Sequence, residues 1–252
     1  MKLYIPSAVL FLHAFPLNKK MYMYQFKDFE RKGIPYIAVD YFGFGEERPF
    51  PTNYTLEQLT DYIVNLLRKN GIKSVIPIGD SMGGYIMFDM WRRYRDIIRG
   101  FVFVSTRAEA DSEEAKQGRY ALIERIKKEG KDFLIDIMLD IQTSPATKEN
   151  KEKMETLKCI MKEATEDGII KALNAMAGRK DSTDILPTIN VPTLVIAGED
   201  DEKVTPPEVV KKIADGIPSA KFLVIPKSAH LPPFENPEEF NSIVIPFVEE
   251  LI

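Results

Sequence analysis

The sequence lacks several features that mark particular classes of protein. Its 252 residues include one cysteine, Cys159, so no internal disulfide can form, which fits a reducing compartment. No run of about 18 apolar residues occurs, which argues against a transmembrane helix. The apolar run Ala8–Leu12 is too short for a secretory signal, and His13 interrupts it. We therefore expect a soluble, cytoplasmic protein without a membrane partner.

Charge of one sign and metal-binding side chains are also scarce. The net charge is -4, and no block of five like charges suggests a nucleic-acid partner. The chain has two histidines, which are far apart, and this argues against a structural zinc site. No phosphate-binding G-x-x-x-x-G-K-[ST] motif occurs, and Gly43-Phe44-Gly45 lacks the third glycine of a dinucleotide fingerprint. We expect no metal and no cofactor.

Short apolar runs alternate with helical patterns along most of the chain. Six runs predict strands buried on both faces of a parallel sheet: Ala8–His13, Tyr36–Val39, Ser74–Ile78, Phe101–Val104, Thr193–Ile196 and Phe222–Ile225. The clearest helix is Thr55–Asn70, with a capping-box pair at Thr55 and Gln58 and a stop at Gly71. This alternation predicts an α/β fold with a doubly wound, mostly parallel sheet.

One segment interrupts the alternation. Residues 108–182 show helical patterns and no strand, so they form a predicted insertion into a core made of residues 1–107 and 183–252. The inserted helices either thicken the domain or form a cap over an active site. Four methionines in the segment are either packing residues or the wall of an adaptable apolar pocket for small, uncharged substrates: Met138, Met154, Met161 and Met176.

A candidate nucleophile follows the third predicted strand. Gly79-Asp80-Ser81-Met82-Gly83 matches G-x-S-x-G, and a helical pattern begins directly after it. This strand–turn–helix setting is the one that a nucleophile elbow requires, and it distinguishes Ser81 from an ordinary surface serine. Glycines flank such a turn because a Cβ would clash there.

Candidates for the base and the acid follow other predicted strands, at the same edge of the sheet as Ser81. His230 follows the last predicted strand, and it is the candidate general base for Ser81. Asp200, Asp201 and Glu202 follow the fifth strand, and any of them could orient the histidine. The order serine, acid, histidine is that of α/β hydrolases.

An oxyanion hole requires two backbone N–H groups near the nucleophile. The candidates are the N–H of Met82 and that of Phe15, which lies in the loop after the first predicted strand. Pro16 has no N–H and cannot serve. His13 is interpreted as a structural residue that holds this loop, not as the base.

With these motifs the sequence resembles the α/β-hydrolase superfamily. Within it, the sequence is most similar to the bacterial branch of esterases, 3-oxoadipate enol-lactonases and haloperoxidase-like enzymes. Four motifs in order carry the resemblance: Leu12-His13-Ala14-Phe15-Pro16-Leu17, Asp40-Tyr41-Phe42-Gly43-Phe44-Gly45, Gly79–Gly84 and Val191–Gly198. Ala14 departs from the usual glycine and Glu46 from the frequent serine. The acid loop is one residue long, and counting from Gly198 selects Asp201 as the acid.

The resemblance implies a serine hydrolase acting on a small, largely apolar ester or lactone. The predicted triad is Ser81, Asp201 and His230, with Phe15 and Met82 supplying the oxyanion hole. Another enzyme on the same triad is the alternative, such as a C–C bond hydrolase, thioesterase, acyltransferase or perhydrolase. A non-catalytic ligand-binding protein is the third hypothesis. The aligned serine, acid and histidine argue against it, because ligand binding alone does not require them.

Overall fold

The sheet at the centre of the molecule is parallel throughout. The computed structural model describes residues 7–47 and 52–252. Its six strands are ordered β2-β1-β3-β4-β5-β6 and pair in parallel. They are β1 (Ser7–Leu12), β2 (Tyr36–Val39), β3 (Ser74–Asp80), β4 (Phe101–Val104), β5 (Thr193–Gly198) and β6 (Ala220–Ile225). All six correspond to the predicted strands, and β2 and β4 match them at both ends.

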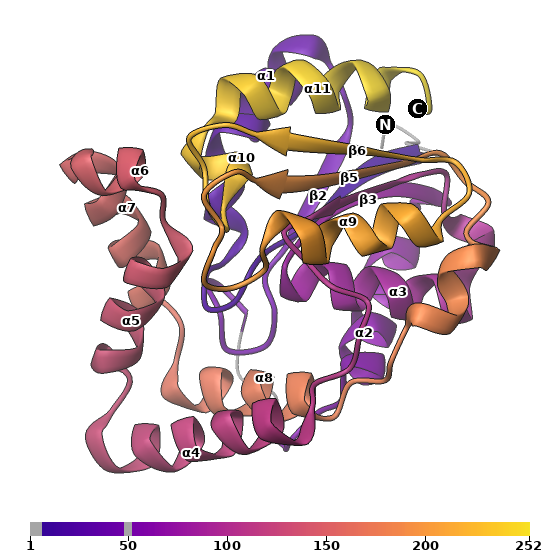
Figure 1. The fold of residues 1–252 in the computed structure, drawn as a ribbon. Helices are drawn as coiled ribbons and strands as arrows, with labels where there is room; N and C mark the ends of the chain where they lie inside the picture. The colour runs from indigo at the N-terminus through magenta and orange to yellow at the C-terminus, as the bar shows by residue number, and fades with distance from the viewer. Residues whose placement is uncertain (1–6, 48–51) are drawn as a thin grey trace.

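Helices cover both faces of this sheet, as a doubly wound fold requires. In Figure 1, α1 (Met23–Lys32) and α11 (Pro237–Glu249) lie above the sheet. Below it lie α2 (Leu56–Lys69), α3 (Met82–Tyr94) and α9 (Pro207–Gly216). The short helix α10 (Pro232–Glu235) precedes α11. The predicted fold class is therefore confirmed.

Alternating side chains of the strands build two apolar cores, one on each face. Val9 and Phe11 of β1 pack in the core between the sheet and helices α1 and α11. Leu10 and Leu12 pack in the core on the opposite face, between the sheet and helices α2 and α3. Because both faces are buried, the strands show continuous apolar runs and no polar alternation. The predicted capping box of α2 is present, since Thr55 and Gln58 bond reciprocally.

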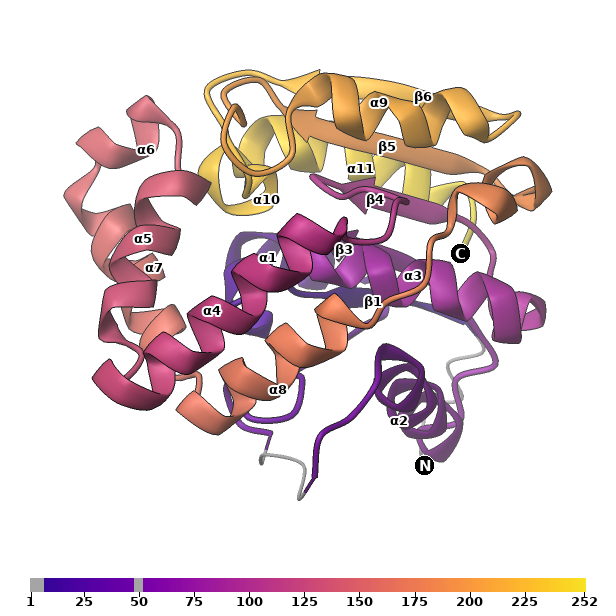
Figure 2. The same ribbon diagram turned by 60° about the horizontal axis from the view of Figure 1, so that its bottom comes forward.

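Among the described residues, five α-helices and a final 3-10 helix (Thr183–Thr188) lie between β4 and β5, with no strand among them. The α-helices are α4 (Glu113–Glu129), α5 (Asp132–Gln142), α6 (Pro145–Glu149), α7 (Lys151–Lys162) and α8 (Glu166–Ala177). Figures 1 and 2 show them gathered at the end of the core to which the strand arrows point, with α4 beside α8. The N–H of Thr165 donates to the carbonyl of Gly43 at 2.8 Å, which ties the start of α8 to the core.

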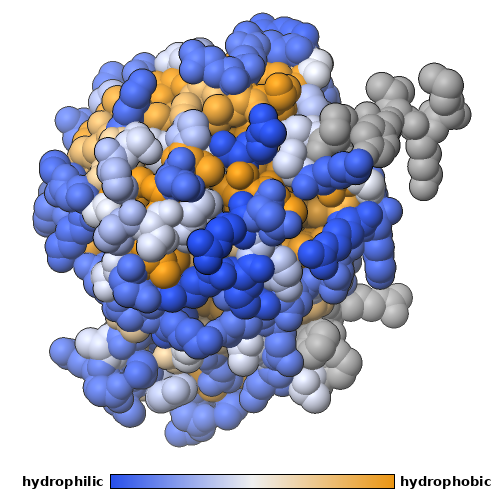
Figure 3. Space-filling view, turned by 90° about the vertical axis from the view of Figure 1, so that its right-hand side faces the viewer, coloured by the Kyte–Doolittle hydropathy of each residue, from blue (hydrophilic) through white to orange (hydrophobic). Residues whose placement is uncertain are grey.

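The molecular surface carries charges of both signs, as the composition indicates. On the face shown in Figure 3, hydrophilic side chains surround a group of apolar ones in the upper part of the view. Among residues 7–47 and 52–252, no helix combines the length and apolarity needed to cross a bilayer.

Two glycines differ in the space around them: Gly198 lies at the end of a strand, and Gly118 lies on an inserted helix. A Cβ on Gly198, at the end of β5, would lie 1.9 Å from the carbonyl oxygen of Ala229. A Cβ on Gly118, inside α4, would meet nothing within 4 Å. The first site therefore has no room for a side chain, whereas the second carries only the conformational cost of glycine in a helix.

We expect Gly198→Ala and Gly118→Ala to change stability in opposite directions. Gly198→Ala should lower the free energy of unfolding by about 2 kcal/mol or more, because backbone must move to admit the methyl group. Gly118→Ala should raise it by up to about 1 kcal/mol, the helix-propensity difference. Urea denaturation of both variants beside the wild type measures the two changes. A stable Gly198→Ala variant would contradict the close approach of Ala229.

A buried carboxyl group ends the central strand. Asp80 of β3 is fully buried, and neither of its oxygens has a hydrogen-bond partner among the described residues. Burial, followed by the charges of Asp201 and Glu235, raises the pKa of Asp80 well above its ordinary value. A neutral, protonated Asp80 is the form that this environment favours.

The raised pKa of Asp80 predicts a pH-dependent stability. The native state keeps the proton while the unfolded chain releases it near pH 4, so Asp80 makes the protein less stable as pH rises from there toward its native pKa. We expect Asp80→Asn to gain on the wild type by up to about 1.4 kcal/mol per pH unit across this window. Urea unfolding of both proteins from pH 4 to 8 measures the difference, and a difference independent of pH would refute the prediction.

Candidate active site

Ser81 lies in a strained turn between β3 and α3. Its φ of 53° and ψ of −108° fall in a region that side-chain-bearing residues rarely adopt. The turn is tight because α3 begins against β1: a Cβ on Gly83 would lie 2.3 Å from the carbonyl oxygen of Leu12. The N–H of Ser81 donates to the carbonyl of Val104 at 2.9 Å, which anchors the turn on the neighbouring strand. This is the geometry that the G-x-S-x-G motif predicts.

His230 and Asp201 form a buried pair beside this turn. The two side chains are fully buried, with His230 Nδ1 at 2.6 Å from Asp201 Oδ2. The other oxygen of Asp201 accepts hydrogen bonds from the N–H groups of Val204 and Thr205, at 3.1 Å each. Nε2 of His230 has no partner among the described residues. The imidazole is thus held at one nitrogen, and the other is available to a hydroxyl group.

Of the three acids that follow β5, Asp201 is the one that pairs with the histidine. Burial raises its pKa, but the charge and hydrogen bond of His230, with the two backbone N–H bonds, outweigh burial and hold the pKa below its ordinary value. Glu202 is exposed and Asp200 is half-buried. Burial, Glu199 and Glu202 raise the pKa of Asp200. Asp201 is therefore the acid of the three that the structure brings to His230.

The two N–H groups predicted for an oxyanion hole belong to the start of α3 and to the loop after β1. Met82 is the first residue of α3, where a helix leaves its N–H groups unpaired. Phe15 lies in the loop after β1, and its carbonyl accepts a 2.8 Å hydrogen bond from the side-chain amide of Gln142. Tyr22 donates its hydroxyl to the carbonyl of Leu12 at 2.9 Å, which fixes the start of the same loop.

His13 holds this loop and does not face Ser81 as a base. Its Nε2 accepts the N–H of Tyr41 at 3.1 Å, and its Nδ1 lies 3.0 Å from the carbonyl of Ala14. The ring stacks on that of Tyr41, with centroids 3.7 Å apart. Burial lowers its pKa to about 4, so the ring is neutral at physiological pH. This arrangement agrees with a structural role.

Glu46, which replaces a frequent serine of the family, lies at the surface. Its N–H donates to a carboxylate oxygen of Asp40 at 3.0 Å, and its side chain pairs with Lys19 at 2.6 Å. Lys19 in turn donates its backbone N–H to Asp40 at 2.9 Å. Glu46 thus belongs to a small ionic cluster that closes the Asp40–Gly45 turn.

Two residues that the sequence patterns did not indicate fix the histidine loop, Glu235 through its side chain and Gln142 through its backbone carbonyl. Glu235 accepts hydrogen bonds at one oxygen from the N–H of Ala229 (2.8 Å) and of Leu231 (3.1 Å), the residues on either side of His230. Its other oxygen accepts the N–H of Ser144, at the start of α6, at 2.6 Å. The carbonyl of Gln142 accepts the N–H of His230 at 3.1 Å. No local motif marks either residue: Gln142 bonds to Phe15 and His230, both distant in sequence, and Glu235 joins its own loop to Ser144, 91 residues away.

Ser81 and His230 share a cavity of about 270 Å³ with residues of the inserted helices. Most of its lining is apolar, and Met138 and Met176 are part of it. Met161 packs instead in the core that also holds Phe11, with Met154 against it. The cavity wall also contains Arg119 of α4, a charge that the expectation of an apolar pocket did not include. Within residues 7–47 and 52–252, no three His, Cys, Asp or Glu side chains are grouped to hold a metal ion.

Comparison with known proteins agrees with this geometry. The model of the alpha/beta hydrolase family matches residues 9–243. A malate-bound structure of a thermophilic esterase from Thermogutta terrifontis has a TM-score of 0.92 and 34% identity, covering 97% of this chain and 90% of that one. The enol-lactonase from Burkholderia xenovorans LB400 has a TM-score of 0.88 at 22% identity, covering 97% and 91%.

A third similarity is to a hydrolase with a different named substrate. The 2-hydroxy-6-oxononadienedioate/2-hydroxy-6-oxononatrienedioate hydrolase of a Pseudomonas species is 26% identical over 227 residues, which is 86% of this chain and 77% of the relative. The family match covers nearly the whole sheet and both loops that carry the buried pair. This chain therefore belongs to the alpha/beta hydrolase family.

Proposed function

We propose that the protein is a serine hydrolase that cleaves a small carboxylic ester or lactone through an acyl-enzyme on Ser81. The observation that carries this proposal is that His230 lines the same cavity as the strained Ser81. Nδ1 of this histidine is held by Asp201, and its Nε2 has no partner among the described residues. A serine hydroxyl is a weak nucleophile until a base takes its proton, and an imidazole held this way is suited to that task.

Acylation is the first half of the proposed reaction. Ser81 Oγ attacks the carbonyl carbon while its proton passes to Nε2 of His230. The oxyanion that forms accepts hydrogen bonds from the N–H groups of Phe15 and Met82. The carbon–oxygen bond to the alcohol then breaks, and the departing oxygen takes the proton from His230. Asp201, whose pKa is lowered, stays ionised and stabilises the imidazolium throughout.

Deacylation repeats these steps with water. His230 takes a proton from a water molecule that attacks the acyl-serine carbonyl, and the same two N–H groups hold the second oxyanion. The bond to Ser81 Oγ breaks, and the proton on His230 returns to the serine. The products are the free acid and the regenerated enzyme.

The helical segment is proposed to act as a cap over this cavity. Its residues Met138, Leu173 and Met176 line the cavity together with Ser81. Closing a site against bulk water strengthens the hydrogen bonds that stabilise the oxyanion. The single cysteine, Cys159, is exposed and unpaired, which supports placing this reaction in the reducing cytoplasm.

A C–C bond hydrolase is the second candidate. The 26% identity with the Pseudomonas hydrolase favours it, and that similarity extends over 86% of this chain. The esterase from Thermogutta terrifontis is more similar, at 34% identity over 97% of the chain. Esters and lactones are therefore the substrates to test first, because the same serine, acid and histidine serve both chemistries.

We expect the triad variants to lose ester hydrolysis to different degrees. Ser81→Ala removes the nucleophile and should lower kcat by about 10⁶-fold, whereas Asp201→Asn should cost about 10⁴-fold because it leaves the serine and the base in place. Hydrolysis of p-nitrophenyl esters from acetate to decanoate measures both losses and gives the preferred chain length.

The control is Ser242→Ala, which removes an exposed hydroxyl on α11. It should hydrolyse the same esters at the wild-type rate. Equal activity of the wild type and Ser81→Ala would eliminate Ser81 as the nucleophile. Activity that tolerates Asp201→Asn but not Asp200→Asn would move the acid to the neighbouring residue.

A further inference from the structure

One charged side chain enters the cavity that holds Ser81. Arg119, on the face of α4 toward the core, is the only Lys, Arg, Asp or Glu among the described residues of the cavity wall. The surroundings are otherwise mostly apolar, with Leu122 and Met176 among its neighbours in the wall. A guanidinium group in such a setting is costly to bury unless a negative charge accompanies it.

The acid that accompanies Arg119 is shared with a second arginine. Arg119 Nε lies 2.5 Å from Asp111 Oδ2, and Arg179 Nη1 lies 2.6 Å from Asp111 Oδ1. Burial raises the pKa of Asp111, but the two guanidinium groups outweigh burial and hold the pKa below its ordinary value. Arginine keeps its charge in proteins, so two positive charges face one negative charge. The cluster has a surplus of one positive charge.

Neighbouring acids are directed elsewhere. The side chain of Glu109 pairs with Lys212 at 3.4 Å, and Asp181 accepts the N–H groups of Ala110 and Thr183. Arg179 is itself almost fully enclosed: it donates to the carbonyls of Glu109 and Met176, and it lies over the ring of Tyr85. Glu113, two residues after Asp111, pairs with Lys116 at 2.6 Å, and Glu114 is exposed, so these acids too are directed away from the two arginines.

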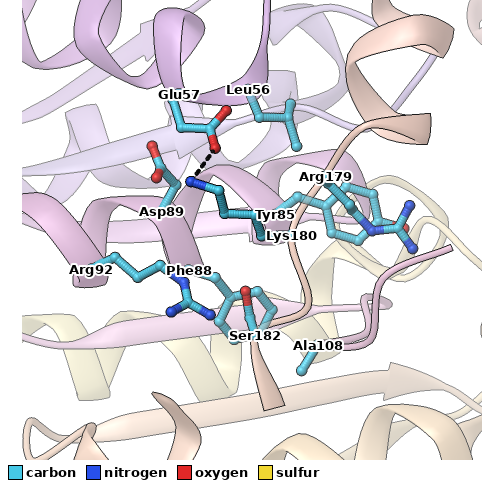
Figure 4. A pocket seen from close by; sticks show the side chains of 10 residues that line it. All are labelled: Leu56, Glu57, Tyr85, Phe88, Asp89, Arg92, Ala108, Arg179, Lys180 and Ser182. Atoms are coloured by element: carbon cyan, nitrogen blue, oxygen red, sulfur yellow. Dashed lines mark ion pairs between the residues drawn. The ribbon is translucent and has the colours of Figure 1, made fainter. Parts of the chain in front are cut away.

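Figure 4 shows that the consecutive residues Arg179 and Lys180 direct their charged groups apart. Lys180 turns toward Glu57 of α2, with which it pairs at 3.1 Å, whereas the guanidinium of Arg179 lies on the other side of Tyr85. The charge of Lys180 is therefore neutralised away from the cluster. The positive charge that reaches the cavity is that of Arg119.

The two arginines differ in what they offer to a ligand. The side chain of Arg179 is 4% exposed, whereas that of Arg119 is 23% exposed. Besides contacting Asp111, Arg119 donates from Nη1 to the sulfur of Met176 at 3.7 Å, and thioether sulfur is a weak acceptor. Arg119 thus retains donor capacity on the side that lines the cavity, while Arg179 neutralises Asp111.

We propose that Arg119 is a specificity-determining residue that binds a carboxylate on the substrate, so that the protein acts on esters or lactones carrying an anionic group in their acyl or alcohol part. This inference rests on the proposed function, since it assigns the substrate class of the same cavity. A carboxylate would pair with the planar guanidinium in two parallel hydrogen bonds. The mostly apolar wall would strengthen that attraction by excluding water.

The first test compares an anionic ester with a neutral ester of the same shape. Monoethyl glutarate and ethyl 5-methylhexanoate place a carboxylate or an isopropyl group at the same distance from the carbonyl. For the alcohol side, 4-acetoxybenzoate and 4-isopropylphenyl acetate form the matched pair. We expect the wild type to prefer the anionic member of at least one pair, as measured by kcat/KM.

Arg119→Gln should lower kcat/KM for the preferred anionic ester by about 10- to 100-fold, and change that of its neutral partner by less than about threefold. The fold should tolerate this change because Asp111 keeps Arg179 as its partner. Arg125→Gln is the control, since it removes the same charge from the exposed side of α4 and should alter neither ester. Thermal denaturation confirms that each variant is folded.

Failure of this inference differs from failure of the proposed function. If the wild type favours the neutral member of both pairs, or if Arg119→Gln slows both members equally, the carboxylate site is refuted while the hydrolase stands. If no ester is hydrolysed, the proposed function fails, and calorimetric titration of Ser81→Ala with glutarate still decides the inference. Binding that Arg119→Gln weakens at least tenfold supports the site, and binding that it leaves unchanged refutes it.

Discussion

The parallel pairing of β5 with β6 is the constraint on which the candidate site depends. The register ends with Gly198 opposite Ile225, and the segments that follow β5 and β6 then leave the sheet together. The N–H of Glu199 still bonds to Ile225, and that of Asp200 to Ser228, so the two loops stay joined beyond the last strand pair. Asp201 and His230 therefore meet at 2.6 Å although 29 residues separate them. The close approach of Gly198 to Ala229 is the steric counterpart of this pairing.

The same edge of the sheet must also hold a strained turn and buried charge, and long-range hydrogen bonds provide the support. Ser81 is fixed through its N–H to β4, and its carbonyl accepts the hydroxyl of Thr106 at 2.8 Å. Glu235 joins the histidine loop to the helical segment, and Gln142 joins that segment to both the histidine loop and the Phe15 loop. Removing a buried acceptor such as Glu235 would leave three N–H groups without partners, so this edge is ordered as one unit.

Local sequence patterns were enough to predict the sheet and the family, because each rests on a short segment. Apolar runs located all six strands, and the elbow glycines indicated the tight turn in which Ser81 has a positive φ. The choice among Asp200, Asp201 and Glu202 needed a count from the strand end, and the pairing with His230 agrees with that count. The links from Glu235 to Ser144 and from Gln142 to Phe15 could not be predicted, since they span 91 and 127 residues and no periodicity connects them. The unpaired state of Asp80 has the same origin: it is a property of the packing and not of the G-x-S-x-G pattern.

Substrate recognition shows the same limit more sharply. Four methionines in the helical segment suggested an apolar pocket, and two of them, Met138 and Met176, do line the cavity. Arg119 lies among charged residues of α4 that form ordinary surface pairs, such as Arg125 with Glu129, and nothing local separates the two arginines. The difference is set by Asp111 and Arg179, which approach α4 from the two ends of the helical segment. A single acid between two arginines leaves a positive charge, and only the three-dimensional arrangement places Arg119 in the wall of the cavity that Ser81 also lines.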